Sequence, residues 1–330
     1  MCDGGRTVAQ SGRDHGLSWP VVQVAFEKAA SAVLPTTAPP TPVLGIDEIR
    51  RGKARFVADS DTGILRQVVD RWFTGFVDLT GRHGLLGQVE GRSAADVGGW
   101  LAAQTPAWRE QVRVVAIDMC ASYRAAIREH LPHATIVVDH FHLVQLANAK
   151  LAQVRRRVTA TVRGRRAHAD DPEYGIRRRL QRNYEDLREG QFADMFARLD
   201  ALGTPGEQVK IAYIVKEELR RLLRLARTDP CRHQIGQQLY VFYSWCAEGD
   251  IGELTQLART VEAWWPQIEA FLATAITNAG SEATNRVSKL EGRNAYGFRN
   301  PEHQRLRCMV ASTRRRRYIH RMTSKTGQTR

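Results

Sequence analysis

Cysteine is scarce in this sequence, and long apolar runs are missing from it. The 330 residues include five cysteines, and no two of them form a C-x-x-C pair. Neither a zinc cluster built on such pairs nor a disulfide framework is therefore supported, and the cysteine content fits a reducing cytoplasm. No apolar run reaches the roughly 18 residues that a membrane helix needs. The first residues also lack the pattern of a secretory signal.

Acidic residues are nearly absent from the last part of the chain. The formal net charge is +14 and the isoelectric point is about 10.1. Residues 286–330 alone hold 13 lysines and arginines but only two acids. A protein that is merely basic would spread its charge, whereas this concentration predicts a polyanionic partner, of which nucleic acid is the commonest.

Two short apolar runs in the first half of the chain are each followed by an aspartate. Val112–Ile117 precedes Asp118, and Thr135–Val138 precedes Asp139. Ala121–His130, between them, has a helical pattern, so the three segments predict a βαβ unit with parallel neighbouring strands. Both aspartates would then lie at the carboxyl edge of an α/β sheet, where ligands bind.

The N-terminal segment predicts a helix after a disordered start. Residues 1–12 are polar and rich in glycine, and we expect them to be poorly ordered. Ser18 is a candidate N-cap, Pro20 an early helix position, and Val21–Leu34 an amphipathic helix. This pattern fits either the end of a helix-turn-helix or a capped surface helix.

A proline-rich linker at 35–42 leads into the predicted sheet. The strand Val43–Ile46 ends at Asp47, and apolar runs separated by glycines follow. These runs predict an antiparallel meander over Phe56–Ala58, Phe73–Leu79 and Leu85–Glu90.

Beyond the βαβ unit only helical patterns remain. The α/β core is predicted to span 43–150 and 276–312, around an all-helical insertion at 151–275, with a frayed basic tail at 313–330. Predicted helices cover 206–227, 232–246, 251–271, 281–289 and 301–312. Trp245, Trp264 and Trp265 are more typical of a helical core than of a surface that stacks on unpaired bases.

Three carboxylates could meet at the sheet edge. In a sheet ordered 3-2-1-4-5, the strands ending at Asp47 and Asp118 are adjacent and parallel, and a late helix can bring Glu282 to them. Clustered carboxylates need cations, and two Mg²⁺ ions in such a site can hold a phosphodiester for cleavage. Taken singly, each acid is more often a turn residue or a helix cap.

Five segments together resemble one family. They are GIDE at 45–48, GLLGQVEGRS at 84–93, VVAIDMCASY at 114–123, LPHATIVVDHFHLVQLAN at 131–148 and TNAGSEATNRVSKLEGRNAYGFRN at 277–300. In this order they resemble the ISL-three family of bacterial insertion-sequence transposases, over about residues 43–310. Five motifs in order are far more specific than any one of them.

The resemblance implies an α/β fold with an RNase H-like mixed five-stranded sheet, flanking helices and a large all-α insertion before the last catalytic helix. It also implies a DDE triad of Asp47, Asp118 and Glu282 that binds two Mg²⁺ or Mn²⁺ ions. The expected reaction is DNA strand cleavage at the element's terminal inverted repeats, followed by transfer into target DNA. A homodimer or larger assembly on DNA, in the bacterial cytoplasm at the nucleoid, is expected.

Further residues are expected around the triad and along the DNA. Those expected to support the triad are Asp139, His140, His142, Asn278 and Asn285, and the two histidines could alternatively bind zinc. Tyr296 is expected to help position DNA. The arginines expected to contact DNA are Arg155, Arg156, Arg157, Arg163, Arg165, Arg293, Arg299, Arg305, Arg307, Arg314, Arg315, Arg316 and Arg317.

The sequence departs from the family at its N-terminus. The cysteine-rich zinc segment is absent and the helix-turn-helix is partial, which predicts a truncated copy. The alternatives are a decayed transposase that binds DNA without mobilising the element, and a different RNase H-like nuclease. A plasmid-nicking assay distinguishes an active transposase from the decayed, DNA-binding form. Joined strand-transfer products would exclude the nuclease that acts without transposition.

Overall fold

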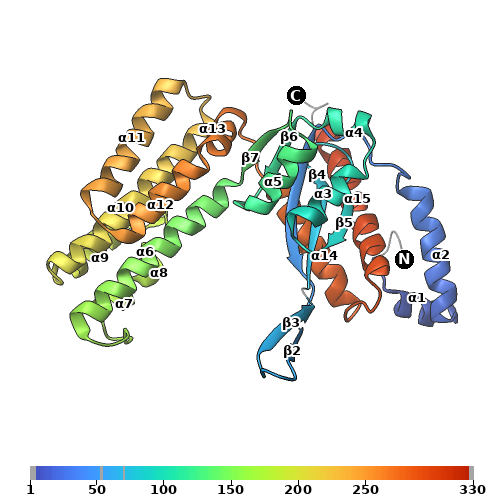
Figure 1. The fold of residues 1–330 in the computed structure, drawn as a ribbon, viewed down its shortest axis with the longest axis horizontal. Coiled ribbons are helices and arrows are strands. Elements are labelled where there is room, and N and C mark those ends of the chain that lie inside the picture. The colour runs from blue at the N-terminus through green and yellow to red at the C-terminus, as the bar shows by residue number, and fades with distance from the viewer. Residues whose placement is uncertain (1–4, 53–54, 70, 327–330) are drawn as a thin grey trace. The chain divides into compact units, whose positions relative to one another are not determined.

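The computed structural model describes residues 5–52, 55–69 and 71–326, which divide into two compact units (Figure 1). The sheet unit comprises Met1–Val137 and Thr277–Arg330, and the helical unit comprises Val138–Ile276. The division falls inside the last strand of the sheet. Among the described residues, none of the helices is both long and apolar enough to cross a bilayer.

The sheet has five strands, β1 (Val43–Arg50), β4 (Trp72–Asp78), β5 (Leu85–Glu90), β6 (Val114–Ile117) and β7 (Thr135–Val138). Their spatial order is β5-β4-β1-β6-β7. Counted along the chain this is 3-2-1-4-5, which confirms the predicted mixed sheet. β1 pairs antiparallel with β4 and parallel with β6, so the predicted neighbours lie side by side.

Helices cover both faces of the sheet, as Figure 1 shows. One face carries α3 (Ala94–Ala102) and α5 (Ala121–His130), where Trp100 stacks on Phe76 with ring centroids 3.8 Å apart. The other carries α14 (Ala279–Asn294) and α15 (Pro301–Thr326), where Cys308 packs on Val77 and Leu85. Because side chains alternate along a strand, the adjacent Phe76 and Val77 serve opposite layers.

The first strand is longer than predicted. We expected it to end at Ile46, before Asp47, but β1 continues to Arg50. The reason is its antiparallel partner β4, which pairs with β1 as far as Arg50 and Trp72. Asp47 is therefore an internal residue of β1, positioned by strand pairing instead of by a turn.

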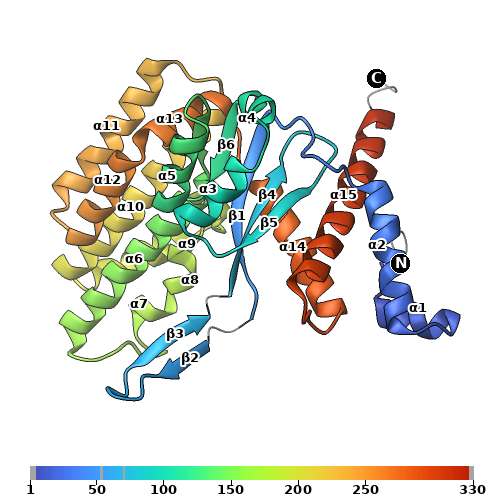
Figure 2. The same cartoon turned by 45° about the vertical axis from the view of Figure 1, so that its right-hand side comes forward.

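The run Phe56–Ala58 was predicted to join the sheet meander, and this is wrong. Residues of this run lie in β2 (Arg55–Ala58), which pairs with β3 (Leu65–Val69) in a separate two-stranded sheet. Figure 2 shows this hairpin extending from the end of the five-stranded sheet. The predicted meander is thus limited to β4 and β5.

The N-terminal region contains a helix where disorder was expected up to residue 12. α1 (Val8–His15) is opened by a capping box of Thr7 and Gln10, and α2 (Trp19–Val33) follows after a short turn. α1 continues through Gly12, where a Cβ atom would lie 2.8 Å from the carbonyl oxygen of Leu17. The glycine permits the close turn between the helices. Residues 1–4 lie outside the described residues.

Two further helices differ from the expectations. α4 (Pro106–Gln111) was not predicted, and it is capped by the Thr105 side chain. α15 continues to Thr326, although the tail was expected to fray from residue 313. Ser312 and Thr313 are buried against the fold, so the helix is anchored past the predicted end.

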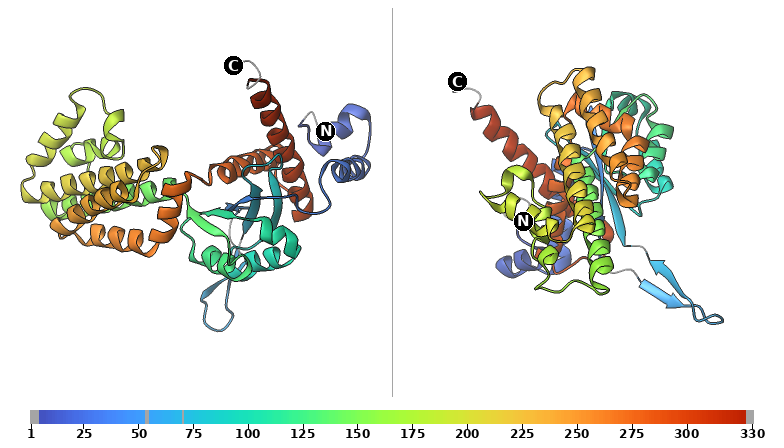
Figure 3. Two further views of the ribbon diagram at one scale, coloured as in Figure 1. Left: turned by 90° about the horizontal axis from the view of Figure 1, so that it is seen from above. Right: turned by 90° about the vertical axis from the view of Figure 1, so that its left-hand side faces the viewer.

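The helical unit consists of helices after Val138 (Figure 3). The predicted helix at 251–271 is divided at Trp264, because Pro266 begins a new helix there. α6 and α10 pack side by side as its longest elements. The elements are α6 (His140–Arg163), α7 (Pro172–Gly175), α8 (Arg177–Leu180), η1 (Tyr184–Asp186), α9 (Gln191–Asp200), α10 (Thr204–Arg224), η2 (Leu225–Arg227), α11 (Arg232–Glu248), α12 (Gly252–Ala263) and α13 (Trp265–Thr274).

Candidate carboxylate site

The parallel ladder of β1 and β6 ends two residues before Asp47 and Asp118. Gly45 of β1 pairs with Ala116 of β6 in the parallel ladder. Asp47 and Asp118 each follow two residues later, so both point to the face on which Gly45 lies. Both side chains are half-buried. The sheet thus brings together two carboxylates from strands separated by more than sixty residues of chain.

The helix α14 packs closely on that same face. A side chain at Gly45 would lie 2.1 Å from the Ser281 hydroxyl oxygen and 2.8 Å from the Asn278 side-chain oxygen. The Asn278 amide donates to the carbonyl oxygen of Ile46 at 3.0 Å. Glycine at position 45 therefore lets α14 lie directly on β1, next to Asp47.

Asn285 links the helix to the first aspartate. Its side-chain amide donates to Asp47 Oδ2 at 2.8 Å, and the backbone N–H of Glu48 donates to Oδ1 at 2.8 Å. Asn285 is 7% exposed. The two oxygens of the Asp47 carboxylate are thereby fixed in orientation by donors that carry no charge.

Glu282 lies on the same helix, three residues before Asn285, so the two share one helix face. Its side chain is 53% exposed and accepts from Arg286 at 2.8 Å, an i,i+4 pair. Because exposed ion pairs of this kind contribute little free energy, the Arg286 contact holds the Glu282 carboxylate only weakly.

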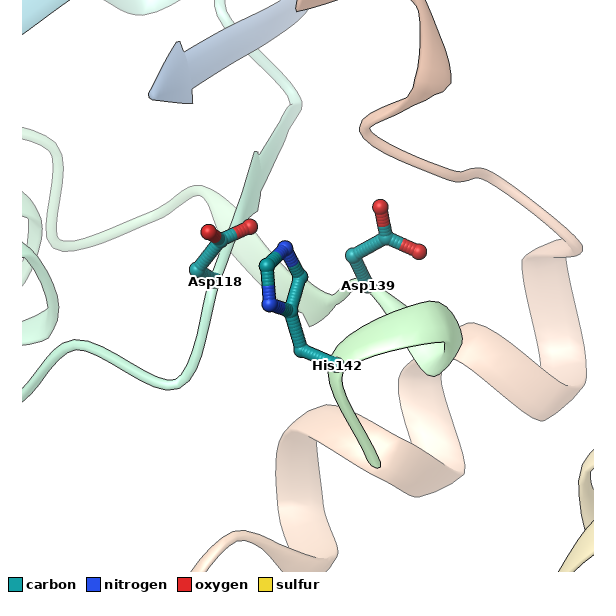
Figure 4. Close-up of side chains that lie close together, drawn as sticks. All are labelled: Asp118, Asp139 and His142. Carbon is teal, nitrogen blue, oxygen red and sulfur yellow. The ribbon is translucent and has the colours of Figure 1, made fainter. Parts of the chain in front are cut away.

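A second group of side chains surrounds Asp118. Asp118, Asp139 and His142 each offer one ligand atom, and these atoms lie within 4.8 Å of one another. Figure 4 shows the His142 ring between the two aspartates. β6 ends just before Asp118, and β7 ends just before Asp139, so the sheet edge brings this group together. Carboxylates and an imidazole make a donor set that suits a divalent metal ion.

Asp139 also caps a helix. It accepts from the backbone N–H of Phe141 at 3.1 Å and is 7% exposed. Burial opposes its ionisation, but the His140 side chain and the Phe141 N–H outweigh burial and hold the pKa of Asp139 below its ordinary value. The His140 ring stacks on Phe271, with centroids 4.9 Å apart. Asp139 is thus a helix cap whose ionised form is favoured by its neighbours.

The opposite face of β1 has a different acid, Glu48. It accepts from the Tyr123 hydroxyl at 3.0 Å, and that hydroxyl also lies 2.9 Å from Thr74 Oγ1. Burial raises the pKa of Tyr123 well above its ordinary value. The sequence did not reveal this pair. Glu48 directly follows Asp47, and only the alternation of side chains along β1 places the two acids on opposite faces of the sheet.

Many of the arginines expected to contact DNA are engaged inside their own unit. In the helical unit, Arg157 binds Glu253, Arg163 binds Glu173 and Arg165 binds Asp171. Arg155 and Arg156 instead line a pocket on α6.

The C-terminal arginines divide in the same way. Arg307, 6% exposed, donates to Glu291 at 2.8 Å, and Arg305 donates to Glu302. Arg316 donates to the Asp78 and Leu79 carbonyl oxygens, and Arg317 to that of Val33. The remaining predicted positions are partly or fully exposed: Arg293, Arg299, Arg314, Arg315 and Tyr296.

The tryptophans of the helical unit are integrated in its packing to different degrees. Trp264 is 7% exposed, whereas Trp245 and Trp265 are partly buried. The prediction that these tryptophans belong to a helical core therefore fits Trp264 best.

A family model with the description Transposase, for DDE enzymes of the ISL-three type, matches residues 44–308. The chain belongs to this family. The match begins in β1 and ends in α15, so it includes the strands and the helix that carry Asp47, Asp118 and Glu282.

Two curated relatives are transposases of insertion sequences. The chain is 29% identical over 248 residues to the transposase for IS1001 of Bordetella parapertussis, covering 73% of this chain and 57% of the relative. It is 27% identical over 253 residues to the transposase for IS1557 of Mycobacterium tuberculosis, covering 70% and 54%. The chain spans about half the length of the curated relatives it matches.

Among solved structures, the chain is similar to the Drosophila P element transposase strand transfer complex. The match covers 82% of this chain and 76% of that chain, with 11% identity and a TM-score of 0.40.

Proposed function

We propose that this chain is the catalytic part of an insertion-sequence transposase. It cleaves DNA strands at the ends of the element and transfers them into target DNA. The observation that carries the proposal is the parallel pairing of β1 with β6, which ends two residues before Asp47 and Asp118, together with the packing of α14 against Asp47. Family membership supports the same reaction class.

Asp47, Asp118 and Glu282 are the proposed catalytic and metal-binding residues. The donor set around Asp118 suits Mg²⁺ or Mn²⁺, because both ions accept carboxylate oxygens. Two such ions, when bound, supply an activated hydroxyl or water nucleophile and neutralise the charge on the leaving oxygen.

The chain's own residues orient these carboxylates. Asn285 holds Asp47, and Asn278 holds α14 against β1. Asp139 and His142 lie beside Asp118, where they orient its carboxylate or bind one ion with it. His140 is proposed to support Asp139, with which its Nδ1 makes a 3.4 Å contact.

DNA is the proposed partner, and the exposed basic side chains are its proposed contacts. Phosphate contacts by arginine give affinity without sequence choice. A transposase must hold two element ends together, so we expect a dimer or larger assembly on DNA, at the nucleoid. The N-terminal helices α1 and α2 are proposed to be part of a helix-turn-helix.

The test is cleavage of a plasmid that carries the gene with its own flanking DNA. We expect nicked or linear plasmid with Mg²⁺ and none with EDTA. Asp118→Asn should abolish cleavage and keep DNA binding. Asp61→Asn, at an exposed position in the β2–β3 hairpin, is the matched control and should cut normally.

If Asp118→Asn cuts as fast as the wild type, the triad assignment is wrong. If the wild type binds DNA but never cuts it with Mg²⁺ or Mn²⁺, the chain is a decayed transposase that acts only by binding. Joined strand-transfer products separate transposition from a simple nuclease reaction.

A further inference from the structure

A pocket of about 290 Å³ in the helical unit has arginines as half of its lining residues. Four arginines line it, Arg155 and Arg156 from α6 and Arg177 and Arg178 from α8. The other lining side chains are apolar or neutral, and no acid is among them. A cavity bounded by four guanidinium groups is strongly attractive to an anion.

Arg155 is the buried member of this set. It is 8% exposed, and within the described part of the chain its Nη1 atom is buried without a hydrogen-bond partner. Burial lowers the pKa of Arg155, and the nearby Arg156 and Arg177 add to this. A buried, unpaired charge costs free energy, so its retention points to a ligand that is absent from the fold itself.

An aromatic ring holds two of the cations in place. The Tyr174 ring centroid lies 3.8 Å from the Arg177 guanidinium carbon and 5.9 Å from that of Arg155. Arg177 also donates to the Tyr174 carbonyl oxygen at 2.9 Å. These contacts reduce the side-chain freedom that anion binding would otherwise remove.

The acids nearest in the chain are already paired elsewhere. Glu173 binds Arg163, Asp171 binds Arg165, and Asp194 contacts Arg179 and Arg198. In the described residues none of the four lining arginines makes an ion pair with a carboxylate. Glu173 attracts Arg155 from a distance and partly offsets its charge, but no carboxylate pairs directly with the arginines of the pocket among the described residues.

The geometry points to a phosphate site: the arginine pocket of α6 and α8 binds a backbone phosphate of DNA. The inference rests on the proposed function in taking DNA as the source of the phosphate. It also divides the arginine-rich stretch by role. Arg155 and Arg156 bind DNA together with Arg177 and Arg178, whereas Arg157, Arg163 and Arg165 hold the helices together.

Equilibrium binding in EDTA separates this site from catalysis. The full chain is titrated against a fluorescein-labelled DNA duplex at several KCl concentrations. The test variant is Arg156→Gln/Arg178→Gln, at two exposed positions of the pocket. The control is Arg227→Gln/Arg232→Gln, which removes the same charge from exposed positions of the same unit outside the pocket.

We expect the test variant to lose about tenfold in affinity at low salt and about one unit of salt slope, since one phosphate contact contributes about 0.9. The control should keep the wild-type slope. Equal slopes for the test variant and the control would overturn the inference and leave the proposed cleavage reaction untouched. A reduced slope in a protein that never cuts DNA would support the inference and overturn the proposed reaction.

Two further experiments identify the ligand of the pocket and the role of Arg155. Arg155→Met should weaken DNA binding without lowering the melting temperature, because it removes an unpaired buried charge. A nucleoside triphosphate and inorganic phosphate are added to the wild type as competitors. If the triphosphate raises the melting temperature of the wild type but the test variant binds DNA normally, the pocket takes a free nucleotide and the DNA assignment is wrong.

Discussion

In the sheet unit, the Asp47 carboxylate is held by the amide of Asn285 at 2.8 Å. In the helical unit, the fully buried Glu173 carboxylate is held by two nitrogens of Arg163, at 2.6 and 2.9 Å. An amide orients a carboxylate without adding charge, whereas a guanidinium also neutralises it. Arginine pairing completes Glu173 as part of the helical fold, whereas the Asn285 amide orients the Asp47 carboxylate without neutralising it.

The same contrast recurs among the arginines. Arg163 pairs directly with the buried Glu173 carboxylate and acts in folding, whereas Arg155 is buried with its Nη1 atom unpartnered. In this chain, structural arginines are distinguished from functional ones by their direct partners. The number of basic residues nearby is less informative.

The largest effect is expected when the acids of the sheet unit are neutralised. Glu282→Gln and Asp47→Asn should each reduce DNA cleavage about 10³-fold, which corresponds to about 4 kcal/mol of transition-state stabilisation. Binding in EDTA should not change. Glu291→Gln on the same helix would remove the partner of Arg307, so it should lower the melting temperature instead. Cleavage at the wild-type rate by Glu282→Gln would remove Glu282 from the site.

A smaller effect is expected when the amide that holds Asp47 is removed. Asn285→Ala should cost about 10- to 100-fold in activity or metal affinity, as is typical for groups that orient a ligand. Titration with Mg²⁺ should show a higher requirement for metal. A variant with an unchanged Mg²⁺ requirement would show that the contact with Asp47 is only structural.

The packing of α14 on β1 can be tested at Gly45. Gly45→Ala should destabilise the sheet unit by about 1–3 kcal/mol through overpacking, because the new methyl group meets Ser281. Adding Ser281→Gly should restore part of both stability and cleavage. A Gly45→Ala protein with unchanged melting temperature and activity would contradict the close approach of helix and strand.

The smallest effect concerns pH and the helical unit. Hydrogen bonding by Arg163 lowers the pKa of Glu173, so this carboxylate stabilises the fold above the ordinary glutamate range, near 4.3. That stability is lost as the pH falls through the lowered pKa. Arg163→Gln leaves a buried carboxylate unpaired, so it should melt earlier at pH 7, and the gap to the wild type should narrow on acidification. A gap that is constant with pH would disprove the pairing.

Much of the fold follows from sequence pattern, and the reasons are local. The boundaries of α5 and β7 matched their predictions, because a buried apolar run and a proline after a helix are strong signals. The parallel neighbours of the sheet followed from the βαβ connection. The continuation of β1 through Asp47 depended on pairing with β4, which no local pattern reveals.

The site was only partly accessible from sequence. Asp47, Asp118 and Glu282 were selected by their positions along the chain. Their catalytic role stays a prediction. The close contact between Gly45 and Ser281 and the pairing of Arg163 with Glu173 depend on tertiary packing. The arginine pocket joins residues of α6 and α8 that share no sequence motif.

Iron-mediated cleavage of the protein itself tests the central claim, that Asp47, Asp118 and Glu282 share one metal site. Fe²⁺ replaces Mg²⁺, and ascorbate with peroxide then generates hydroxyl radicals that cut the backbone near the bound ion. We predict cuts near residues 47, 118 and 282 that excess Mg²⁺ suppresses and that Asp118→Asn abolishes. Cuts confined to the neighbourhood of 118, 139 and 142 would contradict the claim, because the ion would then be bound without Asp47 and Glu282.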